Sequence, residues 1–139
     1  MKDCIFCKIN NKEIPANFIY EDELVIAFLD INPLSEGHTL IAPRKHYSDI
    51  FDIDGKTLER IILVAKKISQ RMKEVLGASG VNLVNASGVS AEQSVFHFHL
   101  HVIPRKDDDN IGFNLWWQTK VKKLSNGRFK ELESRLKFS

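Results

Sequence analysis

The chain has 139 residues, of which 43% are hydrophobic, and a formal net charge of +2 at pH 7. This length and composition suit one globular domain, residues 1–139, with a real hydrophobic core. The near balance of charge indicates no nucleic-acid or membrane partner, and no apolar run reaches the roughly 18 residues of a membrane span. The N-terminus lacks the long apolar stretch of a signal peptide, so we expect a cytoplasmic protein.

Short β-type segments separated by polar or proline-containing turns make up much of the first 105 residues. They are rich in β-branched and aromatic residues, which favour strands. The predicted strands are two within residues 18–31, joined by a polar turn at 21–23, and one each over residues 38–42, 81–85 and 95–103.

A single long amphipathic helix is predicted over residues 57–76, where apolar residues recur at helical spacing. Asp54 is a suitable N-cap and Gly77 a suitable terminator. Adjacent strands around one long helix predict an α+β fold with a mainly antiparallel sheet. A short helix is also expected in the basic C-terminal tail, about residues 120–139.

Three of the five histidines alternate with apolar residues in His97-Phe98-His99-Leu100-His101. On a strand these histidines share one face, roughly 6.5–7 Å apart, and the other face, Phe96, Phe98, Leu100 and Val102, can pack against the long helix. Three interpretations compete: an exposed histidine-rich face, a three-histidine metal site, and a catalytic site with one imidazole as nucleophile. The strict alternation disfavours the first.

The two cysteines, Cys4 and Cys7, have the spacing C-x-x-C. Two cysteines are too few for a secreted disulfide scaffold. The pair is therefore half of a zinc site, a redox dithiol, or two unligated thiols. A thioredoxin-like dithiol needs a preceding strand, and only three residues precede Cys4, which disfavours redox chemistry.

The segment 93–103 resembles the signature of the histidine triad (HIT) family, in which histidine alternates three times with apolar residues. Segments 4–9, 27–33 and 37–46 resemble the family's N-terminal half, so the likeness extends over about residues 4–117. The resemblance implies a HIT-like fold of the zinc-containing bacterial or archaeal type, usually a homodimer.

The resemblance implies three catalytic residues. His99 corresponds to the histidine that attacks the α-phosphate and forms a nucleotidyl-histidine, from which water releases the nucleoside monophosphate. His101 corresponds to the histidine that contacts the phosphate and assists the leaving group. Ser94 corresponds to a hydroxyl at the phosphate or the bridging atom.

The resemblance also implies a set of nucleotide contacts. Asp30 matches the position that binds the ribose hydroxyls, and Phe28 and Ile31 would form the base pocket. Asn85 lies near a polar position that faces the nucleotide, and His38 matches a supporting histidine beside the triad. Gln93 precedes Ser94, and its backbone N–H is expected to stabilise charge on phosphoryl oxygens.

For the cysteines the resemblance favours a structural zinc site with four ligands: Cys4, Cys7, His46 and His97. The substrates it implies are purine nucleotide phosphoramidates or dinucleoside polyphosphates, with water as acceptor because the third triad residue is histidine. Two other functions stay open: a nucleotide-binding regulatory module with little turnover, and a metal-dependent hydrolase using all three histidines as ligands.

Overall fold

The computed structural model describes residues 3–139 and divides into two compact units, one ending at Asp109 and one comprising residues 110–139. The second unit therefore begins before the tail expected from about residue 120. Among residues 3–139, no helix combines the length and apolarity needed to cross a bilayer.

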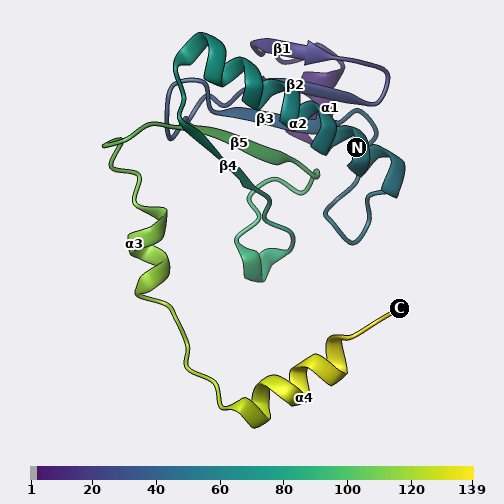
Figure 1. Cartoon of the computed structure of the whole chain (residues 1–139). Coiled ribbons are helices and arrows are strands. Elements are labelled where there is room, and N and C mark those ends of the chain that lie inside the picture. Colours follow the sequence, from purple (N-terminus) through teal and green to yellow (C-terminus); the bar gives the residue numbers. More distant parts are fainter. Residues whose placement is uncertain (1–2) are drawn as a thin grey trace. The chain divides into compact units, whose positions relative to one another are not determined.

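The first unit is built on one five-stranded antiparallel sheet with the strand order β1-β2-β3-β5-β4 (Figure 1). This confirms the α+β class predicted from the sequence. Its elements are α1 (Ile5–Asn10), β1 (Phe18–Glu21), β2 (Val25–Leu29), β3 (Thr39–Pro43), α2 (Gly55–Leu76), β4 (Gly80–Val84), the 3-10 turn η1 (Val89–Ala91) and β5 (Leu100–Arg105).

The sheet buries both faces, and alternate residues of its central strands supply two separate cores. Val25, Ala27 and Ile41 pack with α2 in one core. Ile26 and Phe28, with others on the opposite face, pack with the apolar residues of α1 in the second core. The strands are thus hydrophobic on both sides, which explains their nearly unbroken apolar runs.

Helix α2 has the ends predicted for it. The Asp54 side chain accepts a hydrogen bond from the backbone N–H of Thr57, and Gly77 ends the helix in the left-handed conformation at φ 68°. An N-cap acceptor and a C-terminal glycine satisfy backbone groups that the helix itself leaves unpaired. The apolar face of α2 covers the sheet.

The strand predicted over residues 95–103 is shorter than expected, because β5 begins only at Leu100. Before that point, neighbouring loops replace the strand ladder: the N–H of Phe98 donates to the carbonyl of Tyr47. The side-chain alternation nevertheless holds for Phe98, Leu100 and Val102, which pack in the α2 core. It fails at Phe96, which is 45% exposed.

Helix α1 was not predicted from the sequence. It has six residues and begins after Cys4, whose sulfur accepts a hydrogen bond from the N–H of Cys7. A helix this short is marginal alone in water, so its burial of Phe6 and Ile9 against the sheet must stabilise it.

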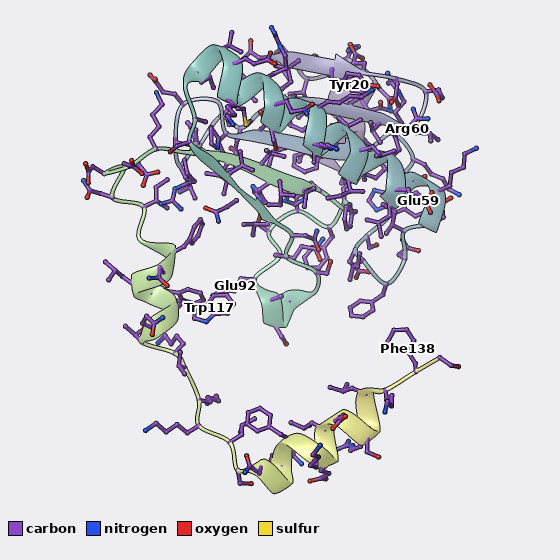
Figure 2. The ribbon with its side chains drawn as sticks, viewed as in Figure 1. Tyr20, Glu59, Arg60, Glu92, Trp117 and Phe138 are labelled. Carbon is purple, nitrogen blue, oxygen red and sulfur yellow. The ribbon has the colours of Figure 1, made fainter. Side chains whose placement is uncertain are left out.

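The second unit contains α3 (Phe113–Gln118) and α4 (Asn126–Leu136), the latter confirming the expected C-terminal helix. Ser125 caps α4 by accepting from the N–H of Arg128. Neither helix contains a buried residue, and side chains such as Trp117 and Phe138 are largely exposed (Figure 2).

Candidate functional site

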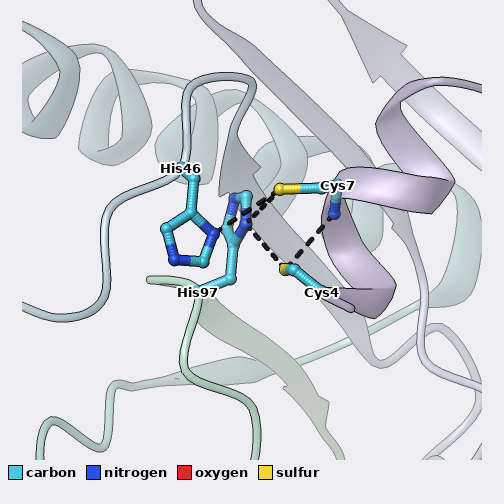
Figure 3. A group of neighbouring side chains, drawn as sticks. All are labelled: Cys4, Cys7, His46 and His97. Atoms are coloured by element: carbon cyan, nitrogen blue, oxygen red, sulfur yellow. Dashed lines mark hydrogen bonds between the residues drawn. The ribbon is translucent and has the colours of Figure 1, made fainter. Parts of the chain in front are cut away.

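Two cysteines and two histidines from three distant segments converge beside α1 (Figure 3). The Nδ1 atom of His97 lies 3.3 Å from the sulfur of Cys4 and 3.6 Å from that of Cys7. The Nδ1 atom of His46 lies 3.5 Å from the Cys7 sulfur. All four ligand atoms lie within 4.8 Å of one another.

This donor set fits a four-coordinate metal ion. Two sulfur and two imidazole ligands suit zinc, and tetrahedral Zn–S and Zn–N bonds separate ligand atoms by roughly 3.3–3.8 Å. The Nε2 of His97 lies 2.8 Å from the carbonyl of Pro43, which can only accept, so Nε2 carries the proton. The unprotonated Nδ1 then faces the two sulfurs, as expected of a metal-ligating histidine.

His99 follows two residues later and is 5% exposed. Its Nδ1 donates to the carbonyl of His97 at 2.8 Å. Burial lowers the pKa of His99, although the bond to His97 opposes this shift. A neutral ring with its proton on Nδ1 has a lone pair on Nε2, which is the form that a nucleophilic imidazole requires.

A chain of hydrogen bonds fixes the ring of His101. The N–H of Leu34 donates to Nδ1 of His38, so the proton of neutral His38 lies on Nε2. That Nε2 lies 2.9 Å from Nδ1 of His101 and donates to it. The proton of His101 is therefore on its own Nε2, where it can be donated.

Burial keeps both rings of this second pair neutral. It lowers the pKa of His101 to about 4, with repulsion from His99 and His38 acting in the same direction. Burial also lowers the pKa of His38, while the carboxylate of Asp30, 3.6 Å from its Nε2, raises it.

A cavity of about 370 Å³ opens beside His99 and His101. It combines an apolar wall with a few polar groups, the usual composition of a small-molecule site. Six of the residues expected at the site line it: Phe28, Asp30, Ile31, Ser94, His99 and His101.

Three of the other expected residues do not line this cavity. The N–H of Gln93 donates to the carbonyl of Gly88 at 3.2 Å. The amide of Asn85 contacts the carbonyl of His99. His38 contacts His101 and does not line the cavity.

The sequence analysis missed one wall of the cavity, which α1 and the turn after it provide. Ile5, Phe6 and Ile9 line it, and the ring of Phe6 packs edge-on against His97 and His99, with centroids 5.8 and 5.0 Å away. The spacing of these three residues is helical and could have indicated a buried helix face.

Comparisons with known proteins agree with this geometry. Residues 11–108 match the family described as "HIT domain". An uncharacterized HIT-like protein of Borreliella burgdorferi is 46% identical over 98% of this chain and 97% of its own length. Adenylylsulfatase HINT3 of Arabidopsis thaliana is 38% identical over 77% of this chain and 54% of its own length.

A solved structure of similar fold is bound to zinc. A zinc-bound histidine triad family protein from Mycobacterium smegmatis is 40% identical, with a TM-score of 0.78 over 81% of each chain. The present chain thus shares its fold with a zinc-bound protein, and its own Cys/His cluster is a possible zinc site.

Proposed function

The chain belongs to the histidine triad (HIT) family, and from this premise we propose that it hydrolyses purine nucleotide phosphoramidates or dinucleoside polyphosphates. One observation carries the proposal: His99 donates its Nδ1 proton to His97 and so keeps a lone pair on Nε2 at the cavity. The retained third histidine favours water over a sugar phosphate as acceptor.

The reaction has two displacements at the α-phosphorus. In the first, Nε2 of His99 attacks phosphorus, the bond to the leaving nitrogen or oxygen breaks, and His101 donates its Nε2 proton to that atom. In the second, His101 accepts a proton from water, the water oxygen attacks phosphorus, and the bond to His99 breaks. Nucleoside monophosphate leaves, and both rings return to their starting forms.

The cavity accounts for nucleotide binding in this proposal. The carboxylate of Asp30 accepts from the ribose hydroxyls, and Phe28 and Ile31 contact the purine. Ile31 is 85% exposed, so a bound base would cover apolar surface now facing solvent. Ser94 donates its hydroxyl to the phosphate or the bridging atom.

In this proposal zinc is bound by Cys4, Cys7, His46 and His97. With four protein ligands the ion would be structural, cross-linking α1 to the loop after β3 and to the segment before β5. Cysteine ligands must stay reduced, which fits the cytoplasm.

The face formed by α2 and β4 supports a homodimer in this proposal. A groove of about 540 Å³ lies between them, with Leu63 and Leu83 57% and 44% exposed beside it. β4 is also a sheet edge, which needs covering. We expect a dimer by sedimentation that Leu83→Glu dissociates, and a monomeric wild type would contradict it.

The function is tested with an adenosine phosphoramidate and a diadenosine polyphosphate, both labelled at the α-phosphate, with and without chelator. Wild type is expected to release AMP and, after rapid acid-free quenching, to carry label bound to protein. His99→Ala should bind AMP but form no labelled protein. Turnover without bound label, or undiminished in the variant, would overturn the covalent mechanism.

The same experiment separates the other functions. A regulatory binding module would bind AMP without turnover of either substrate. A metal-dependent hydrolase would lose activity with a removable ion while the protein stays folded. Either result would reject the proposal.

A further inference from the structure

Asn85 begins the loop that leaves β4, and its side chain reaches the main chain of His99. Its Nδ2 lies 2.9 Å from the carbonyl oxygen of His99. β4 pairs with β5 from Gly80–Arg105 to Val84–His101, and no pair follows Val84. The amide of Asn85 therefore supplies a donor just beyond the point where the β4 ladder ends.

A second hydrogen bond sets the orientation of this amide. The N–H of Ile50 donates to the hydroxyl oxygen of Ser87 at 2.9 Å. Ser87 has a single proton, which it donates to Oδ1 of Asn85 at 2.8 Å. With Oδ1 used as the acceptor, Nδ2 must face His99, so the amide cannot turn over without breaking this bond.

The residues joined by these hydrogen bonds come from loops that meet beside His99, the proposed nucleophile. Figure 1 shows β4 running into the loop that carries η1, which returns to β5. Gln93 ties this loop together, since its side chain accepts from Gly88 and donates to the carbonyls of Ser48 and Val95. His99 lies outside the strands, so these loop bonds take the place of a ladder in holding its main chain.

We infer that Asn85 is a positioning residue that orients His99 through its main-chain carbonyl. The inference rests on the proposed function of His99 as nucleophile. The His97 carbonyl holds the His99 ring, and the Asn85 amide holds the His99 backbone. Together they fix the direction of the Nε2 lone pair toward phosphorus.

The test separates binding from chemistry. For Asn85→Ala we expect a rate of labelled nucleotidyl-histidine formation about 10- to 100-fold lower, the cost of a misaligned nucleophile, with KM and AMP affinity within about twofold of wild type. Asn85→Asp keeps the shape but cannot donate, so it should be equally slow. Asn85→Gln keeps the donor and should recover part of the rate.

Asn82→Ala is the matched control, because this asparagine lies on β4 itself. Its Oδ1 accepts from Arg105, at the far end of β5, at 2.7 Å. The variant should leave the rate within about twofold of wild type. A raised KM at unchanged rate would make Asn85 a nucleotide contact, and wild-type behaviour would remove its role. Either outcome overturns the inference about Asn85. The proposed function would still be supported if the wild-type protein carries bound label, and it would be rejected if the wild-type protein carries none.

Discussion

Two pairs of histidines flank His99, and they use the same ring in different ways. His97, beside His46, turns an unprotonated nitrogen toward two sulfur atoms, whereas His38 and His101 turn a proton from one ring toward the other. The difference comes from the group behind each pair. The Pro43 carbonyl accepts from His97, while the Leu34 N–H donates to His38. A backbone acceptor prepares a metal ligand, and a backbone donor prepares a proton donor.

The largest effect is expected from removing one of the sulfur atoms that face the His46–His97 pair. Cys4→Ser keeps an N-cap acceptor for α1, since serine is a preferred cap, but removes a thiolate ligand. We expect bound zinc to fall well below one per chain and the free energy of unfolding to drop by about 4 kcal/mol. Metal analysis of untagged protein and urea unfolding measure both.

Cys4→Ser also controls for the role of Cys4 as N-cap of α1. Serine can cap the helix too, so a loss of stability in this variant is not due to a lost cap. Full zinc content and wild-type stability in Cys4→Ser would show that Cys4 is not a ligand of a structural metal.

The proton-donating pair is broken by His38→Ala, which leaves Nδ1 of His101 without its donor. We expect kcat to fall roughly 10- to 100-fold for an amine leaving group, which needs protonation. A nitrophenolate leaving group needs no proton and should be affected less. Stopped-flow rates for the two substrates provide the comparison, and an equal loss with both would contradict a role in proton donation. Zinc content should be unchanged.

Acidification tests the burial of the His38–His101 pair through linkage. The pKa of His101 is lowered to about 4 by burial and by neighbouring histidines, whereas an unfolded histidine titrates near 6.5. The unfolded chain therefore binds an extra proton between about pH 6.5 and pH 4. This contribution to stability is complete above that range and is lost as pH falls through it.

His101→Asn should remove this contribution. Its free energy of unfolding should fall less steeply from pH 6.5 to 4.5 than that of wild type, measured by urea unfolding of the zinc-loaded proteins. Equal slopes for the two proteins would show that His101 is not buried as a neutral ring.

The smallest effect concerns Phe6, which contacts the rings of both His97 and His99. Phe6→Leu roughly conserves volume, so we expect a loss of about 1 kcal/mol in stability and a fall in kcat below about fivefold. Phe18→Leu is the matched control, because Phe18 packs on Phe28 as Phe6 does. An equally large fall in kcat for Phe18→Leu would show that the contact of Phe6 on α1 with the histidine rings has no specific effect on catalysis.

The sequence predicted what depends on local pattern. The alternation around His99 and the caps of α2 are of this kind, because strand and helix periods appear in neighbouring residues. It did not predict α1, because helical spacing within only six residues is a weak signal and a cysteine takes the place of a usual cap.

The side-chain contacts of Gln93 and Asn85 could not be predicted, for another reason. Their partners, Ser48 and the Ser87–Ile50 pair, lie on loops brought together by the fold. The start of β5 at Leu100 likewise depends on where β4 ends. Contacts between loops that are distant in the sequence cannot be predicted from a local pattern.

His97 meets two demands with separate parts of one residue. Its ring faces the cysteines, and its carbonyl orients His99. Every amino acid has that carbonyl, so the proposed chemistry at His99 sets no requirement on the side chain at position 97; only the proposed metal site does. Position 97 is therefore open to exchange for another metal-binding side chain such as cysteine, while position 99 accepts histidine alone. Within the triad, the first histidine is the one that could be replaced in a redesigned protein without redesigning the reaction.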